Sequence, residues 1–125
     1  MQQRPTAAEL LADISALLGQ VIDHVPEYQK HQVRVAANLS AIVEREVTLG
    51  RANDDAERAR LAELFGQPET TDLAALRNLL LVRLTDPTPL EPEESVAIYD
   101  VLLDTVRADL AIAKPGYADW TREET

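Results

Sequence analysis

Apolar residues recur every three or four positions along almost the whole chain, and this spacing constrains the fold more than any other feature. Strands instead alternate every second residue, and the sequence contains no such alternating segment. A repeat of three and four is typical of α-helices that bury one face. The repeats cover five segments, near residues 6–25, 27–49, 53–65, 71–84 and 93–113. The sequence therefore predicts an all-α fold, a bundle of about five helices.

Capping residues, glycines and prolines mark the ends of these segments. Thr6, three residues before Glu9, predicts a capping box at the start of the first helix. Gly50 predicts the end of the second helix, and Asn53-Asp54-Asp55 predicts the cap of a separate third helix. Three closely spaced prolines in the segment 85–92 predict a stiff loop before the fifth helix.

The connections between the predicted helices are all short, which favours one domain over residues 1–125. The last segment, 114–125, is polar apart from Trp120 and Tyr117. We expect this tail either to fray or to dock on the body through Trp120.

The charge of the chain restricts its partners. Its 22 acidic and 12 basic residues give a formal net charge of −10. This acidity disfavours binding to nucleic acid and to anionic membrane surfaces, and it favours solubility. The longest purely apolar run, residues 79–82, is far too short to span a membrane, and no secretory signal is recognisable. We therefore expect a cytoplasmic protein.

The sequence contains no recognisable catalytic or metal-binding motif. Cysteine is absent, which excludes disulfides, thiolate ligands and thiol nucleophiles, and the glycines are isolated rather than gathered in a phosphate-binding loop. His24 and His31 are the only histidines and do not supply a usual metal ligand set. We therefore expect no metal and no cofactor, and an enzymatic activity is the less favoured interpretation.

The second predicted helix carries the most informative pattern. Its small residues would let another helix approach closely, so we expect this helix near the centre of the bundle. Beside its apolar line of Val35, Leu39, Ile42 and Leu49 runs a polar stripe, spaced by three, four and seven residues: His31, Arg34, Asn38 and Arg45. Such a stripe can bind an anion or a partner's carboxylate, because arginine donates two parallel hydrogen bonds. The alternative is an internal network that ties two helices together.

Three runs of residues resemble a known family. They are the opening Arg4 to Leu11, the central run from His31 to Glu46, and the closing Leu110 to Tyr117. Together they are similar to a bacterial family of small helical proteins of unknown function. Genes of this family often lie beside aminoglycoside-phosphotransferase-like kinases and acyl-CoA dehydrogenases. The resemblance implies an accessory role in a phosphotransfer or acyl-CoA pathway and supplies no catalytic residue.

Three functions are consistent with these observations. The first is an accessory or interaction module that binds a neighbour-encoded enzyme as its protein partner. The second is a small-molecule binding protein, in which the polar stripe holds a CoA ester or a phosphorylated metabolite. The third is a structural homodimer that uses the fourth or fifth helix, because the fourth is apolar nearly all round in its second half.

Overall fold

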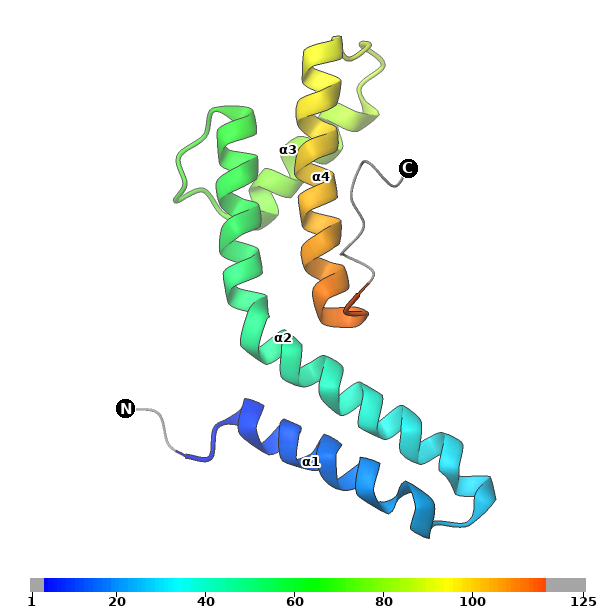
Figure 1. The fold of residues 1–125 in the computed structure, drawn as a ribbon. Coiled ribbons are helices and arrows are strands. Elements are labelled where there is room, and N and C mark those ends of the chain that lie inside the picture. Colours follow the sequence, from blue (N-terminus) through cyan, green and yellow to red (C-terminus); the bar gives the residue numbers. More distant parts are fainter. Residues whose placement is uncertain (1–3, 117–125) are drawn as a thin grey trace. The chain divides into compact units, whose positions relative to one another are not determined.

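The computed structural model describes residues 4–116 of the chain, and this part contains helices and no strand. Its elements are α1 (Ala7–Val21), the single 3₁₀ turn η1 (Ile22–His24), α2 (Glu27–Phe65), α3 (Leu73–Thr85) and α4 (Pro92–Ala113), as Figure 1 shows. The predicted all-α class is confirmed. The predicted number of five helices is wrong, because there are four α-helices in the described part. None of these helices is long and apolar enough to cross a membrane.

The second and third predicted helices are one helix of 39 residues, α2. Gly50 lies within it in a helical conformation, whereas Gly66, with a φ of 62°, takes the left-handed conformation just after its end. A glycine inside a helix costs about 1 kcal/mol relative to alanine, too little to end a helix that can continue its hydrogen bonds. Asn53, predicted to be a cap, donates its side-chain amide to the carbonyl of Ala108 at 3.3 Å instead.

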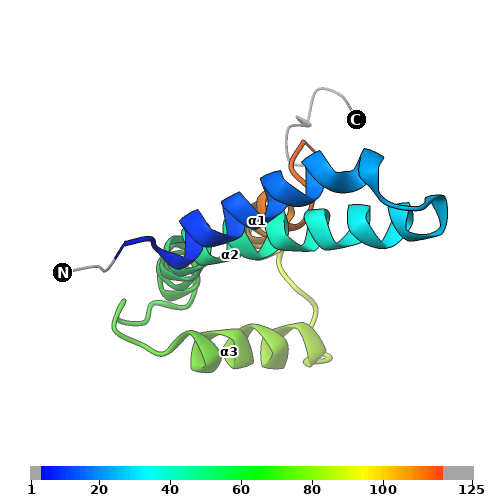
Figure 2. The same ribbon diagram turned by 90° about the horizontal axis from the view of Figure 1, so that it is seen from below.

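The chain divides into two compact units, residues 1–50 and 51–125. The first unit is an antiparallel hairpin of α1 and the first half of α2, which lie side by side in Figures 1 and 2. Thr6 caps α1 as predicted, accepting a hydrogen bond from the Glu9 amide at 3.2 Å. The hydroxyl of Ser15 donates to the carbonyl of Ala37 at 3.1 Å, so the small residues of α2 do admit a neighbouring helix.

The predicted central position of residues 27–49 is wrong. The structure describes every residue from 4 to 50, and none of them is buried. Val35 and Leu39, predicted to belong to the apolar core line, are 41% and 54% exposed. The hairpin has only two helices, so each helix can cover only one side of the other.

The buried core lies in the second unit. Leu61 and Ala62 of α2 pack with Leu76 of α3, and each of the three is at most 1% exposed. Ile98 and Ile112 are the buried residues of α4. The second half of α3 is not buried on several sides, since only Leu80 packs against the core there, whereas Leu81 and Val82 are more than half exposed. The predictions of one domain and of a subunit interface on α3 or α4 stay predictions, and Trp120 lies outside the described residues.

An ion pair joins α2 to α3 beside this core. The Nε and Nη2 atoms of Arg77 donate to the two carboxylate oxygens of Glu57 at 3.0 and 2.6 Å. The Glu57 side chain is only 11% exposed, whereas that of Arg77 is 55% exposed. These hydrogen bonds raise the pKa of Arg77 above its ordinary value. The paired carboxylate can therefore be tolerated at the edge of an apolar core.

A second ion pair closes the proline-rich loop between α3 and α4. Arg83 donates to both carboxylate oxygens of Glu94, at 2.8 and 2.6 Å, and also to the carbonyls of Thr88 and Pro89. The hydrogen bond from Arg83 holds the pKa of Glu94 below its ordinary value. At the start of the loop, the Thr88 amide lowers the pKa of Asp86 in the same way. The loop is therefore stiffened by charge as well as by proline.

Replacing Glu94 by glutamine should lower the melting temperature at pH 7 and have less effect in acid. The folded-state pKa of Glu94 lies below the ordinary value of 4.5, so its contribution to stability is fully present above that value. The contribution is lost as the pH falls through the lower, folded-state pKa. Thermal unfolding from pH 7 to pH 3 should show the difference between native and variant chains shrinking below about pH 4.5. A difference that stays constant with pH would contradict this role for the pair.

Candidate functional site

The predicted polar stripe lies on one edge of α2 in the first unit. His31, Arg34 and Asn38 are exposed and Arg45 is half-buried. Within the described part of the chain, the side chains of the first three make no hydrogen bond or ion pair. The spacing thus places the four side chains along one edge, as expected from 100° per residue. Whether this edge binds a ligand or a partner stays a prediction.

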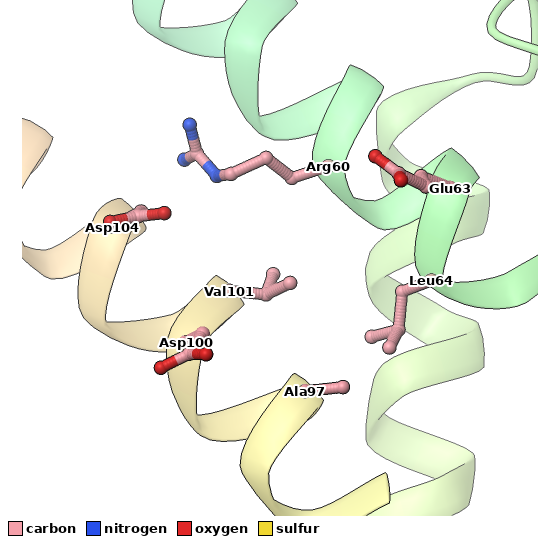
Figure 3. A pocket seen from close by; sticks show the side chains of 7 residues that line it. All are labelled: Arg60, Glu63, Leu64, Ala97, Asp100, Val101 and Asp104. Carbon is pink, nitrogen blue, oxygen red and sulfur yellow. The ribbon is translucent and has the colours of Figure 1, made fainter. Parts of the chain in front are cut away.

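A cleft of about 470 Å³ opens within the second unit, between the second half of α2 and α4. The two helices are joined next to it, because Arg60 donates to the hydroxyl of Thr105 at 3.2 Å. Figure 3 shows Leu64 and Val101 pointing towards one another from the two helices. The residues that line this acid-rimmed cleft are Arg60, Glu63, Leu64, Ala97, Asp100, Val101 and Asp104.

The cleft has an aliphatic floor and a charged rim. Leu64, Ala97 and Val101 form the floor, and the rim carries three carboxylates and one guanidinium. Arg60 extends from α2 towards α4 in Figure 3, and its Nε atom is buried without a hydrogen-bond partner among the described residues. The rim is therefore net negative and attracts cationic groups. Across residues 4–116 no three His, Cys, Asp or Glu side chains are grouped to hold a metal ion.

The side of α4 that is turned away from this cleft is apolar and exposed. Val96, Tyr99 and Val106 are each at least half exposed, and Leu102 is 38% exposed. We call these four residues the outer stripe of α4. Their spacing of three and four residues predicts a buried helix face, whereas the structure exposes it. Val96 precedes Asp100 by four residues, so the Val96 end of the outer stripe borders the acidic rim, whereas the other three residues lie on the side of α4 turned away from the cleft.

Sequence reasoning missed the cleft, although part of its signal was present. Arg60, Glu63 and Leu64 share one helix face by their spacing, as do Ala97, Asp100 and Asp104. The sequence does not show that these two helix faces are neighbours in the fold. Of the charges near residue 57, Arg58 pairs locally with Asp55, whereas Glu57 pairs with Arg77 of α3.

Comparison with known proteins identifies the family of the chain. Residues 23–117 match the model of a family described as a domain of unknown function (DUF6285). The match covers more than half of the chain, so the chain belongs to this family. No curated protein and no solved structure matches it. The predicted resemblance to a family of unknown function is confirmed, while the bacterial origin and the gene neighbours stay predictions.

Proposed function

We propose that this DUF6285 chain is an interaction module that binds a partner protein through its second unit. The observation that carries the proposal is the acid-rimmed cleft, with its aliphatic floor. Exposed apolar patches that are rimmed by polar residues are typical of protein-binding surfaces. The outer stripe, on the other side of α4, offers a second apolar contact area.

The chemistry of the cleft suits a basic side chain of the partner. A lysine or arginine could lay its aliphatic stem on Leu64 and Val101 and place its charge among the carboxylates. The hydrogen bond to Thr105 supports Arg60 beside these carboxylates. The excess of acidic over basic residues in 51–125, sixteen against eight, would also speed the approach of a basic partner.

The outer stripe suits an amphipathic helix of the partner. Its members recur at three and four residues along α4, so they form one line on the helix surface. A helix with apolar residues at the same spacing could pack along this line. Tyr99 adds an aromatic ring, a residue type enriched in the centres of protein interfaces.

The resemblance described above suggests the class of partner. The expected partner is a kinase-like or acyl-CoA-processing enzyme encoded beside this chain. The chain would act as an accessory protein of that enzyme. Such an enzyme should present a basic, partly apolar helix to α4 if the proposal is correct. Gene neighbourhood only associates the two proteins, so the surface chemistry must be tested directly.

Replacing Asp104 by arginine should weaken binding of the neighbour-encoded enzyme by at least about tenfold, because like charges at an interface are strongly unfavourable. The measurement is co-purification of the tagged full chain with that enzyme, followed by titration calorimetry. The matched control is Glu69→Arg, which makes the same charge change in the exposed loop between α2 and α3. Equal effects of the two variants, or no association of the native chain at micromolar concentration, would refute the proposal.

A further inference from the structure

One face of the N-terminal hairpin is apolar and is not covered within this unit. No residue from 4 to 50 is buried, although this unit contains many aliphatic side chains. Seven of them, between 41% and 58% exposed, make up what we call the hairpin face: Leu10, Ile14 and Leu17 on α1, and Val35, Leu39, Val43 and Val47 on α2.

The two helices present these residues towards neighbouring sides of the hairpin. On α1 the exposed residues lie about 100° around the helix from the side of Leu11, Ser15 and Leu18, which faces α2. On α2 the exposed line is turned in the same sense from the side of Ala37, by about 80–120° at Val47 and Val43 and by about 160–200° at Leu39 and Val35. Because α1 and α2 run antiparallel (Figures 1 and 2), rotations in the same sense point to the same side of the hairpin. The hairpin face therefore runs from α1 over to Val43 and Val47 and continues round the outer side of α2.

We propose that a second copy of this chain covers the hairpin face, so that two hairpins form a four-helix bundle. Two helices enclose no interior, whereas four enclose a core of the kind found in natural bundles. Units of this small size usually need oligomerisation or another staple to bury enough apolar surface. Covering seven half-exposed aliphatic side chains on each copy gives an interface on the order of 1,000 Å², about the lower limit for a specific dimer.

The charge distribution favours self-association through this half of the chain. Residues 1–50 carry six acidic and four basic residues, whereas residues 51–125 carry sixteen and eight. Two copies that met through residues 51–125 would bring together surfaces with a net charge of −8 each. Like charges across an interface oppose association, so the nearly neutral hairpin is the better self-contact.

Leu39→Glu and Ile14→Glu should each convert the full chain from dimer to monomer. Sedimentation velocity from about 1 to about 100 µM should show the native chain at twice its mass of 13.8 kDa, with at least a tenfold weaker dimer in either variant. The matched control is Val96→Glu on the outer stripe of α4, which should leave the dimer intact. A native chain that stays monomeric, or a dimer broken by Val96→Glu and not by Leu39→Glu, would overturn the proposal.

The outcomes of this test are independent of the proposed enzyme partner, since Val96→Glu and Asp104→Arg probe that interaction on the other unit.

Discussion

Replacing Leu76 by alanine should lower the free energy of unfolding by about 2–5 kcal/mol, the range for large-to-small changes in a close-packed core. Leu76 has no exposed surface and packs against Leu61 and Ala62. Both neighbours are at most 1% exposed, so the substitution leaves a cavity inside the core and not at its surface. Urea titration followed by circular dichroism should show a lower midpoint with an unchanged slope.

The control for this prediction lies on the same helix. Leu81 is 59% exposed, so Leu81→Ala removes the same atoms without opening a cavity. It should change the free energy of unfolding by no more than about 0.5 kcal/mol. Comparable losses from the two substitutions would show that another chain or segment covers Leu81, and that burial within this chain does not determine the stability of α3.

The local signals in the sequence were sufficient for the helices and insufficient for their junctions. The Thr6 cap, the proline-rich loop and the extent of α4 were predicted because each depends on residues a few positions apart. The fusion of two predicted helices at Gly50 was missed because a glycine ends a helix only where the backbone turns left-handed. Gly50 and Gly66 carry the same signal for the end of a helix in the sequence. Of the two, only Gly66 adopts the left-handed conformation.

The larger error in the prediction from sequence concerned the position of the core. Its cause differs from that of the error at Gly50. Helical periodicity identifies an apolar line and does not say what covers it. On α4 the buried residues are Ile98 and Ile112, while the line through Val96, Tyr99 and Leu102 faces outward. When a helix is apolar on two sides, the sequence does not show which side is buried unless the neighbouring helices are known. The same ambiguity hid the exposed residues of α2 and the cleft beside α4.

Removing Arg77 should destabilise the chain more than removing both partners of its ion pair. In Arg77→Ala the Glu57 carboxylate, only 11% exposed, loses both of its short hydrogen bonds from the guanidinium. A charge left unpaired in this way should cost about 1–3 kcal/mol, below the value for a fully buried pair because Arg77 itself is half exposed. Replacing both residues by leucine removes the charge together with its partner, so most of this loss should be recovered.

A double-mutant cycle distinguishes this ion pair from an ordinary surface pair. The free energies of unfolding of Arg77→Ala, Glu57→Ala and the double alanine variant should reveal a coupling of at least about 1 kcal/mol. The matched pair is Arg58 with Asp55, which is local and solvent-exposed on α2 and should show no more than about 0.5 kcal/mol. If the two couplings are equal, burial of Glu57 contributes nothing, and the contact between α2 and α3 depends on the apolar core alone. If the coupling is larger for Glu57, this one carboxylate fixes the register of α3 against α2, because only one position of Arg77 satisfies both of its oxygens.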